Sequence, residues 1–230
     1  MAIDMNVKVP TDESLDAFIQ MASGFGFKGI ASTLPGREPI ERTVENMVLF
    51  TRTDISKKGL RAVKKAVEGA RPHSAIVAVS LAETSVANWA ANDSRVDLLT
   101  LDDPLKGASL RRSTAKLAAS SDTALEIPIS PLLGLSGLAR SKIIKVLREN
   151  AQTALDAGMP IVLSSGATEP IALRAPRALC HVGLLFGLDW NDCEKAVYEN
   201  PNKIVSRNEK RFSSDYLGLG MEIVKRGGSP

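Results

Sequence analysis

The sequence predicts an α/β protein whose best-fitting architecture is a TIM-like (β/α) barrel. Short apolar runs alternate with longer helical patterns along most of the chain. Most of the short runs are almost continuous valine, isoleucine and leucine, which is typical of strands buried on both faces. The connections between the runs are long enough to hold a helix, as the connections between parallel strands must be.

The length of 230 residues fits one barrel domain covering residues 1–230. Seven strands are predicted, and an eighth is either missing or hidden after Gly187. We therefore expect an irregular or incomplete barrel of seven to eight parallel strands, with an open doubly wound sheet as the alternative. Only residues 226–230 are expected to form a loose C-terminal tail.

The predicted elements follow one another in regular order. The strands are the seven apolar runs Met5–Val9, Gly29–Thr33, Met47–Arg52, Ala75–Ser80, Val96–Leu101, Ala124–Ile129 and Ile161–Ser165. The helices are the longer segments Asp12–Ser23, Ser56–Ala70, Glu83–Ala91, Leu110–Ser120, Ser136–Asp156, Pro170–Phe186 and Asn191–Glu199. Asp12 and Ser56 are of the type that caps a helix start.

Composition restricts the function classes. Hydrophobic residues make up 44% and charged residues 24%, which is ordinary for a globular protein, and only 4% are aromatic. A nucleic-acid surface built on many stacking rings is therefore not expected.

The net charge is +3, and residues 46–230 hold 25 basic and 19 acidic side chains. The two cysteines, Cys180 and Cys193, form no disulfide framework or zinc spacing, and no run resembles a signal peptide or a membrane span. These features favour the cytoplasm.

Two familiar motifs fail on their context. Gly24–Gly29 matches the dinucleotide-binding pattern in letters, but it follows a predicted helix and leads into a strand, which is the reverse of what phosphate binding needs. His73 and His181 are the only histidines, and neither belongs to a metal-binding pattern.

The loop after the last predicted strand carries a candidate phosphate site. Its residues Ser164, Ser165, Gly166 and Ala167 lie where barrel loops often hold phosphate with backbone N–H groups, and Arg174 and Arg177 follow. The alternative is a plain loop with two solvent-facing arginines. Glu126, late in its strand, is either a catalytic carboxylate or a buried acid paired with an arginine, because no second carboxylate completes an acid/base pair.

Four ordered blocks resemble the archaeal ribonuclease P protein component 3 family. Arg95–Leu101 is similar to the family's R-V-D-I/L-L block, and Ala124–Leu133 is similar to A-L-E-I-x-x-S-P-L-L. The third block resembles the family's strand and the R-x-P-R-x-L helix start that follows it, and it covers Pro160–Ala167 and Leu173–Leu179. Asn200–Asn208 fits the closing pattern N-P-x-x-x-x-x-R-N. The resemblance runs, with gaps, from Met47 to Arg211.

The resemblance implies a barrel related to the polymerase-and-histidinol-phosphatase superfamily. Metal-dependent members carry a histidine-rich motif near the first strand, and here that place, Ile3–Lys8, holds no histidine. The resemblance therefore implies that this chain binds no metal or cofactor and is not itself catalytic. The implied holoenzyme is a ribonucleoprotein whose RNA cuts the 5′ leader from precursor tRNA with magnesium.

The resemblance also implies partners. They are the ribonuclease P RNA, ribonuclease P protein component 2 and, indirectly, precursor tRNA, with no membrane. Phosphate contacts are then expected from basic residues on three helices and near the loop: Lys57, Arg61, Lys64, Lys65, Arg111, Arg112, Lys116, Lys142, Lys145, Arg148, Arg174 and Arg177.

From the residues alone, other interpretations stay open. The basic helix faces are also typical of a solvated barrel surface. A barrel hydrolase or aldolase acting on a phosphorylated small molecule is the alternative function, and a protein-only scaffold is a third.

Overall fold

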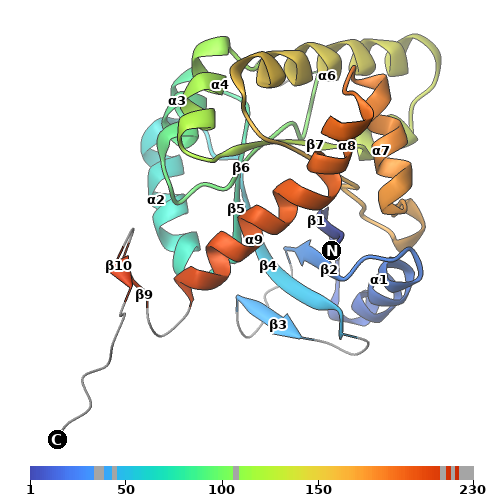
Figure 1. Ribbon diagram of the computed structural model, residues 1–230, viewed down its shortest axis with the longest axis horizontal. Coiled ribbons are helices and arrows are strands. Elements are labelled where there is room, and N and C mark those ends of the chain that lie inside the picture. The colour runs from blue at the N-terminus through green and yellow to red at the C-terminus, as the bar shows by residue number, and fades with distance from the viewer. Residues whose placement is uncertain (34–38, 43–45, 106–108, 213–215, 219–220, 223–230) are drawn as a thin grey trace, which may run out of the picture.

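The computed structural model describes residues 1–33, 39–42, 46–105, 109–212, 216–218 and 221–222. The predicted tail at 226–230 lies outside this part of the chain. Seven parallel strands form the barrel wall in the order β1-β2-β4-β5-β6-β7-β8 (Figure 1). Their bounds are Ile3–Val7, Gly29–Ser32, Val48–Ile55, Ile76–Ser80, Leu98–Thr100, Ala124–Pro128 and Ile161–Ser164. The prediction of an α/β barrel is confirmed.

Three short strands were not predicted. β3 (Ile40–Arg42) pairs antiparallel with the first half of β4, and β9 (Tyr216–Gly218) pairs antiparallel with β10 (Met221–Glu222) outside the barrel. Runs of two or three residues are too short to show a periodic pattern, which explains why the sequence did not reveal them.

The barrel closes through a short seam between β1 and the chain after β8. Val7 forms a single parallel bridge with Ala167. Around it, the Lys8 amide donates to the Ala167 carbonyl at 2.7 Å, and the Gly166 amide donates to the Asn6 carbonyl at 2.9 Å. No eighth parallel strand follows Gly187 in the described residues, so the expected irregular barrel has seven.

A helical segment packs against the two strands that meet at this seam. The π-helical turn η4 (Lys195–Glu199) and helix α9 (Asn200–Arg211) pack against both β8 and β1. α9 crosses the N-terminal ends of the strands. Its position is seen from its side chains, which donate to backbone carbonyls at that end of the barrel. Asn200 donates to the Ile161 carbonyl, Arg207 to that of Asp122 and Asn208 to that of Ala75, each at 2.8–2.9 Å.

Most other helices surround the barrel. They are α1 (Asp12–Gly24), α2 (Leu60–Ala70), α3 (Thr84–Asn92), α4 (Arg112–Ser120), α5 (Ser130–Leu133), α6 (Gly137–Ala157), α7 (Pro176–Leu185) and α8 (Trp190–Glu194), with the 3₁₀ turns η2 (Arg71–His73) and η3 (Pro170–Ala172). Figure 1 shows them, with α6 as the longest.

Two predicted helices begin later than expected. The helix predicted from Ser56 starts at Leu60, because Gly59 adopts φ +82°, which no helix continues through. The helix predicted from Pro170 is a 3₁₀ turn followed by α7, because Ala175 is extended (ψ 149°) ahead of Pro176. The first correction places Lys57 in the loop before α2, and the second places Arg174 before α7.

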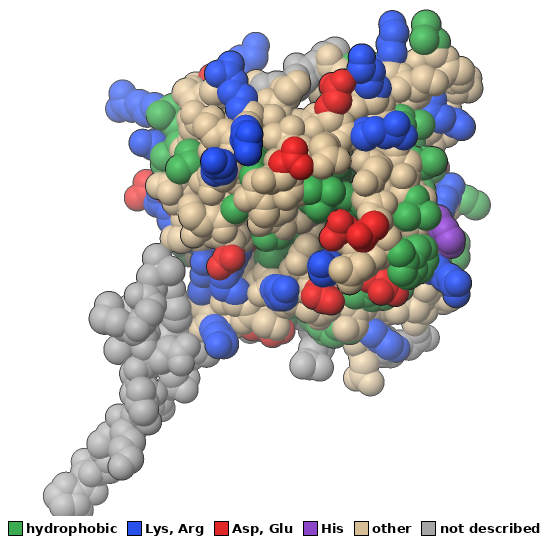
Figure 2. All heavy atoms as spheres, turned by 45° about the horizontal axis from the view of Figure 1, so that its top comes forward, with side chains coloured by type: hydrophobic (Ala, Val, Ile, Leu, Met, Phe, Trp, Pro, Cys, Tyr) green, Lys and Arg blue, Asp and Glu red, His purple; other side chains and the backbone are tan. Residues whose placement is uncertain are grey.

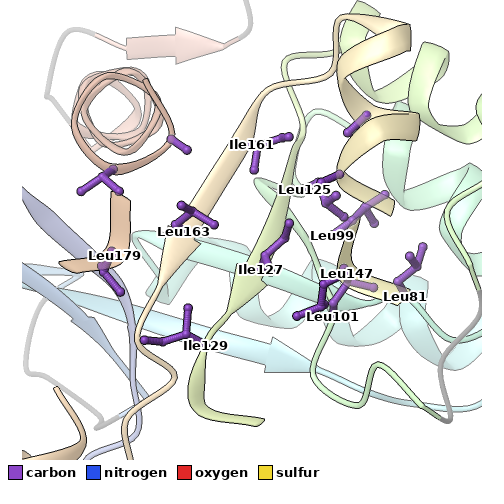
Figure 3. Packing of buried hydrophobic residues seen from close by; sticks show 14 of the residues in the cluster. Leu81, Leu99, Leu101, Leu125, Ile127, Ile129, Leu147, Ile161, Leu163 and Leu179 are labelled. Atoms are coloured by element: carbon purple, nitrogen blue, oxygen red, sulfur yellow. The ribbon is translucent and has the colours of Figure 1, made fainter. Parts of the chain in front are cut away.

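Apolar side chains bury both faces of the strands. The barrel interior contains Met5, Phe50 and Ile76, and Ile204 and Val205 of α9 close its N-terminal end. A Cβ on Gly29 would lie 2.9 Å from the Phe50 ring, so this position requires glycine. The outer faces of β7 and β8 pack on the helices, as Figure 3 shows for Ile127 and Leu163. No helix within the described ranges is long and apolar enough to cross a membrane.

Candidate nucleic-acid interface

Polar side chains replace apolar ones at the C-terminal end of the barrel interior. Arg52 of β4 is fully buried and holds Glu126 of β7 through two bonds of 2.7 and 2.6 Å. Arg52 also pairs with Asp54 at 2.7 Å and donates to the Met5 carbonyl. Burial alone would lower the pKa of Arg52, but the charges and hydrogen bonds of Glu126 and Asp54 together outweigh burial and raise that pKa.

Glu126 accepts further hydrogen bonds from neighbouring strands. Ser164 of β8 donates its hydroxyl at 2.9 Å, and Asn6 of β1 donates its amide at 3.4 Å. With Arg52, these donors occupy both carboxylate oxygens. Of the two interpretations of Glu126, the structure therefore shows the buried acid paired with an arginine.

Asp4 lies beside this network on β1. Its Oδ1 accepts from the backbone N–H of Ser165 at 3.1 Å and from the backbone N–H of Asn6 at 3.2 Å, whereas Oδ2 has no hydrogen-bond partner. Burial raises the pKa of Asp4 to about 6. Within the described residues no group of three His, Cys, Asp or Glu side chains is placed to hold a metal.

The predicted phosphate loop is turned inward. Ser164, Ser165, Gly166 and Ala167 are all buried. The amides of the last three donate to Asp4 Oδ1, to the Asn6 carbonyl and to Ser165 Oγ. These N–H groups close the seam between β1 and β8, so the loop does not present free amides to a phosphate as the prediction required.

Arg174 and Arg177 differ in their surroundings. The Arg174 guanidinium donates to the carbonyls of Ile171 and Leu173 at 2.8 and 2.7 Å, so it stabilises the turn before α7. Arg177 is exposed in the first turn of α7. Only Arg177 therefore has the open position that both arginines were predicted to have.

The basic residues predicted on helices are exposed. Lys57 precedes α2. Arg61 and Lys65 lie on α2 opposite the buried Val63 and Val67, and Lys64 lies beside them. Lys64 lies 5.6 Å from the centre of the Trp89 ring of α3, which holds its ammonium over the neighbouring helix.

Two neighbouring helices carry the remaining predicted cations. Arg111, Arg112 and Lys116 are exposed at α4, as are Lys142, Lys145 and Arg148 on α6. Lys145 pairs with Glu149 at 3.9 Å, and Arg148 donates to the Leu185 carbonyl at 2.9 Å.

The elements that carry these cations are linked through neighbouring helices. α2 contacts α3, α3 contacts α4, and α4 contacts α6. Neither α3 nor α4 contains an acidic residue. Figure 2 shows Lys and Arg side chains along the upper part of its face, where Figure 1 places α4 and α6. We call the cations of these elements the basic belt: Lys57, Arg61, Lys64, Lys65, Arg111, Arg112, Lys116, Lys142, Lys145 and Arg148.

A second charged cluster lies at the opposite end of the barrel. The buried Asp97 pairs with Arg71 at 2.7 Å and with Arg207 at 2.9 Å, and Arg211 lies 3.9 Å away. Sequence reasoning did not predict this cluster. Both residues lie in blocks that the sequence analysis singled out, Asp97 in the R-V-D block and Arg207 in the closing block. Neither block by itself indicates that the two side chains form an ion pair.

Known proteins resemble this chain over nearly its whole length. "Ribonuclease P protein component 3" of Methanosarcina barkeri is 27% identical over 225 residues, covering 95% of this chain and 93% of the relative. The protein of the same name from Methanococcoides burtonii is also 27% identical, over 91% of this chain and 88% of the relative.

A solved structure has the same fold. A chain in the cryo-EM structure of archaeal ribonuclease P with mature tRNA matches with a TM-score of 0.80 and 18% identity, covering 99% of this chain and all of that chain. The model of the family described as RNase P subunit p30 matches residues 1–213. The chain therefore belongs to the RNase P subunit p30 family.

Proposed function

We propose that this chain is a non-catalytic protein subunit of ribonuclease P that binds the RNA subunit through the basic belt and supports removal of the 5′ leader from precursor tRNA. The observation that carries the proposal is the belt itself, in which exposed cations lie on α2, α4 and α6, and these helices are linked to one another through α3. Lysine and arginine on such a surface neutralise phosphates without reading bases.

The proposed partners extend the resemblance. Ribonuclease P protein component 2 is the proposed protein partner, and precursor tRNA is contacted indirectly. Catalytic magnesium is proposed to be held by the RNA and not by this chain. Support comes from the barrel interior, where the guanidinium of Arg52 already supplies the positive charge beside Glu126.

A barrel hydrolase acting on a phosphorylated small molecule is less well supported. That function needs a free phosphate loop and an available carboxylate. Here the amides of Ser165, Gly166 and Ala167 are used inside the fold, and both oxygens of Glu126 accept hydrogen bonds.

RNA binding through the belt is tested by a salt series. Arg112→Gln with Lys116→Gln removes two exposed cations of α4. We expect unchanged melting, because surface substitutions usually stay within about 0.5 kcal/mol. Each lost phosphate contact should reduce the slope of log affinity against log salt by roughly 0.7–0.9. The measurement is a titration of the chain with the cognate RNA subunit at several salt concentrations.

Lys203→Gln is the matched control. Lys203 is equally a surface cation, but it lies on α9, outside the belt. It should leave both the RNA affinity and the slope unchanged. An α4 double variant that binds like the wild type would exclude α4 from the RNA interface. Reconstituted cleavage of precursor tRNA, with and without the wild-type chain, tests the subunit role itself.

A further inference from the structure

An apolar groove lies between α5, α6 and α7, away from the polar interior. Its volume is about 200 Å³, and its lining includes Leu132 and Leu133 of α5, Ile144 of α6, and Val182 and Leu185 of α7. Small-molecule pockets usually exceed about 300 Å³. The size therefore suits inserted side chains of another polypeptide better than a cofactor.

Exposed apolar side chains gather around this groove. The described residues include ten large hydrophobic side chains that are exposed, and five of them lie on α5, α6, α7 or α8: Leu133, Leu138, Leu184, Leu185 and Trp190. In Figure 2, hydrophobic side chains gather at the right-hand side, where α7 and α8 lie in Figure 1. Exposed apolar side chains that gather on neighbouring elements mark an interaction surface more often than scattered single residues do.

The charges at the groove are all positive. Arg140 lines it, and Arg148 follows on the same side of α6, where its guanidinium holds the Leu185 carbonyl of α7. Arg177 lies at the start of α7. Residues 130–148 and 176–185 contain five cations and no acid. The first acid of α6 is Glu149, and the next after α7 is Asp189.

We propose that this groove, which we call the α5–α7 groove, docks an acidic amphipathic helix from another protein subunit of the same particle. The proposal rests on the proposed function and adds a protein-binding surface to it. Apolar residues of the partner helix would fill the groove between Ile144 and Val182, as in helix-in-groove recognition. Its acidic residues would meet Arg140, which lines the groove with Ile144 and has no acid within four residues of it in the sequence.

Two other occupants fit less well. RNA would be drawn by the cations, but phosphates and sugars gain nothing from exposed leucines such as Leu133 and Leu185. A second copy of this chain would place Arg140 and Lys142 of the two copies near one another across a two-fold axis, and like charges oppose such contacts.

The test uses the full chain and the other protein subunits of the cognate particle, each purified singly. Leu185→Asp and Leu133→Asp place a charge on the apolar lining, and Arg140→Glu reverses the groove cation. Phe25→Asp is the matched control, because Phe25 at the end of α1 is a comparably exposed apolar side chain that belongs to neither the groove nor the basic belt. Binding is measured by titration calorimetry, and a thermal melt of each variant confirms that it is folded.

We expect at least one protein subunit to bind the wild-type chain, and each groove variant to bind it about tenfold or more weakly, with the control unchanged. Unchanged binding of the groove variants, or no protein subunit binding the wild type, would overturn the proposal. A loss of RNA affinity instead would assign the groove to RNA, and a wild-type dimer lost in the variants would assign it to a second copy. If the wild-type chain did not support cleavage, the proposed function would be contradicted. The binding titrations would still test the groove, because they do not depend on cleavage.

Discussion

Replacing Glu126 with glutamine is expected to destabilise the fold strongly while leaving the proposed RNA-binding surface intact. Glu126 and Arg52 have no exposed side-chain area and share two bonds of 2.7 and 2.6 Å. The glutamine keeps the size of the side chain but removes the charge that balances a buried guanidinium. Its amide N–H₂ would also face the N–H donors of Arg52.

The structure sets the size of the effect. Removing one partner of a buried ion pair costs about 3–5 kcal/mol. Asp54 remains 2.7 Å from Arg52 and is partly exposed, so it offsets part of the loss. We therefore expect about 3 kcal/mol, at the lower end of that range. For a chain of this size the loss corresponds to a fall of roughly 6–12 °C in melting temperature.

A double-mutant cycle with Arg52→Met separates the ion pair from general disruption. The double variant leaves no unpaired guanidinium in the interior, so it should lose less stability than the sum of the two single variants. The assays are thermal and urea unfolding, followed by RNA titration at a temperature where every variant is folded. Additive losses would refute the coupling, and a folded Glu126→Gln chain that binds RNA normally but supports no cleavage would point to a catalytic carboxylate.

Two further predictions concern Asp4 and the arginines near α7. Burial raises the pKa of Asp4 from 3.8 to about 6, which corresponds to about 3 kcal/mol. The folded chain holds this proton more tightly than the unfolded chain, so this contribution is complete below about pH 4 and lost as pH rises through about 6. Asp4→Asn should therefore gain stability over the wild type across that window in melts from pH 4 to 8, and a constant difference would contradict the assignment. Arg174→Ala should lose about 1–2 kcal/mol because Arg174 donates to two carbonyls, whereas Arg177→Ala should melt like the Lys142→Ala control and reduce stimulation of cleavage. Equal melting of Arg174→Ala and Arg177→Ala would contradict this distinction.

The strand–helix alternation could be predicted because each parallel strand buries both faces and so leaves an apolar run. β5 (Ile76–Ser80) and β8 (Ile161–Ser164) lie within the predicted runs. Closure could not be predicted in the same way. The barrel closes where β1 meets the chain after β8, and η4 and α9 pack against both strands, so closure depends on contacts between residues far apart in the sequence.

The candidate site was only partly visible in the sequence. Exposure of cations on α2, α4 and α6 follows from helical periodicity, and the structure places them as expected. The inward turn of Ser164–Ala167 follows from Asp4 and Asn6, which lie about 160 residues away, so no local pattern could reveal it. Arg174 likewise seemed free because its acceptors are backbone carbonyls, which every sequence contains.

The two ends of the barrel explain why function is proposed for the outer surface. In barrel enzymes the C-terminal end of the strands holds the reacting groups. Here that end is filled by Arg52, Glu126 and Asp4, whose hydrogen bonds are directed at one another and at the seam. At the N-terminal end, α9 covers the interior and Arg207 binds the buried Asp97. Because the side chains at both ends of the barrel bind one another, the surrounding helices offer the remaining large surfaces.

The basic belt and the α5–α7 groove meet on α6, where Lys142 and Lys145 belong to the belt and Ile144 lines the groove. One helix can therefore bring RNA and a protein partner next to each other.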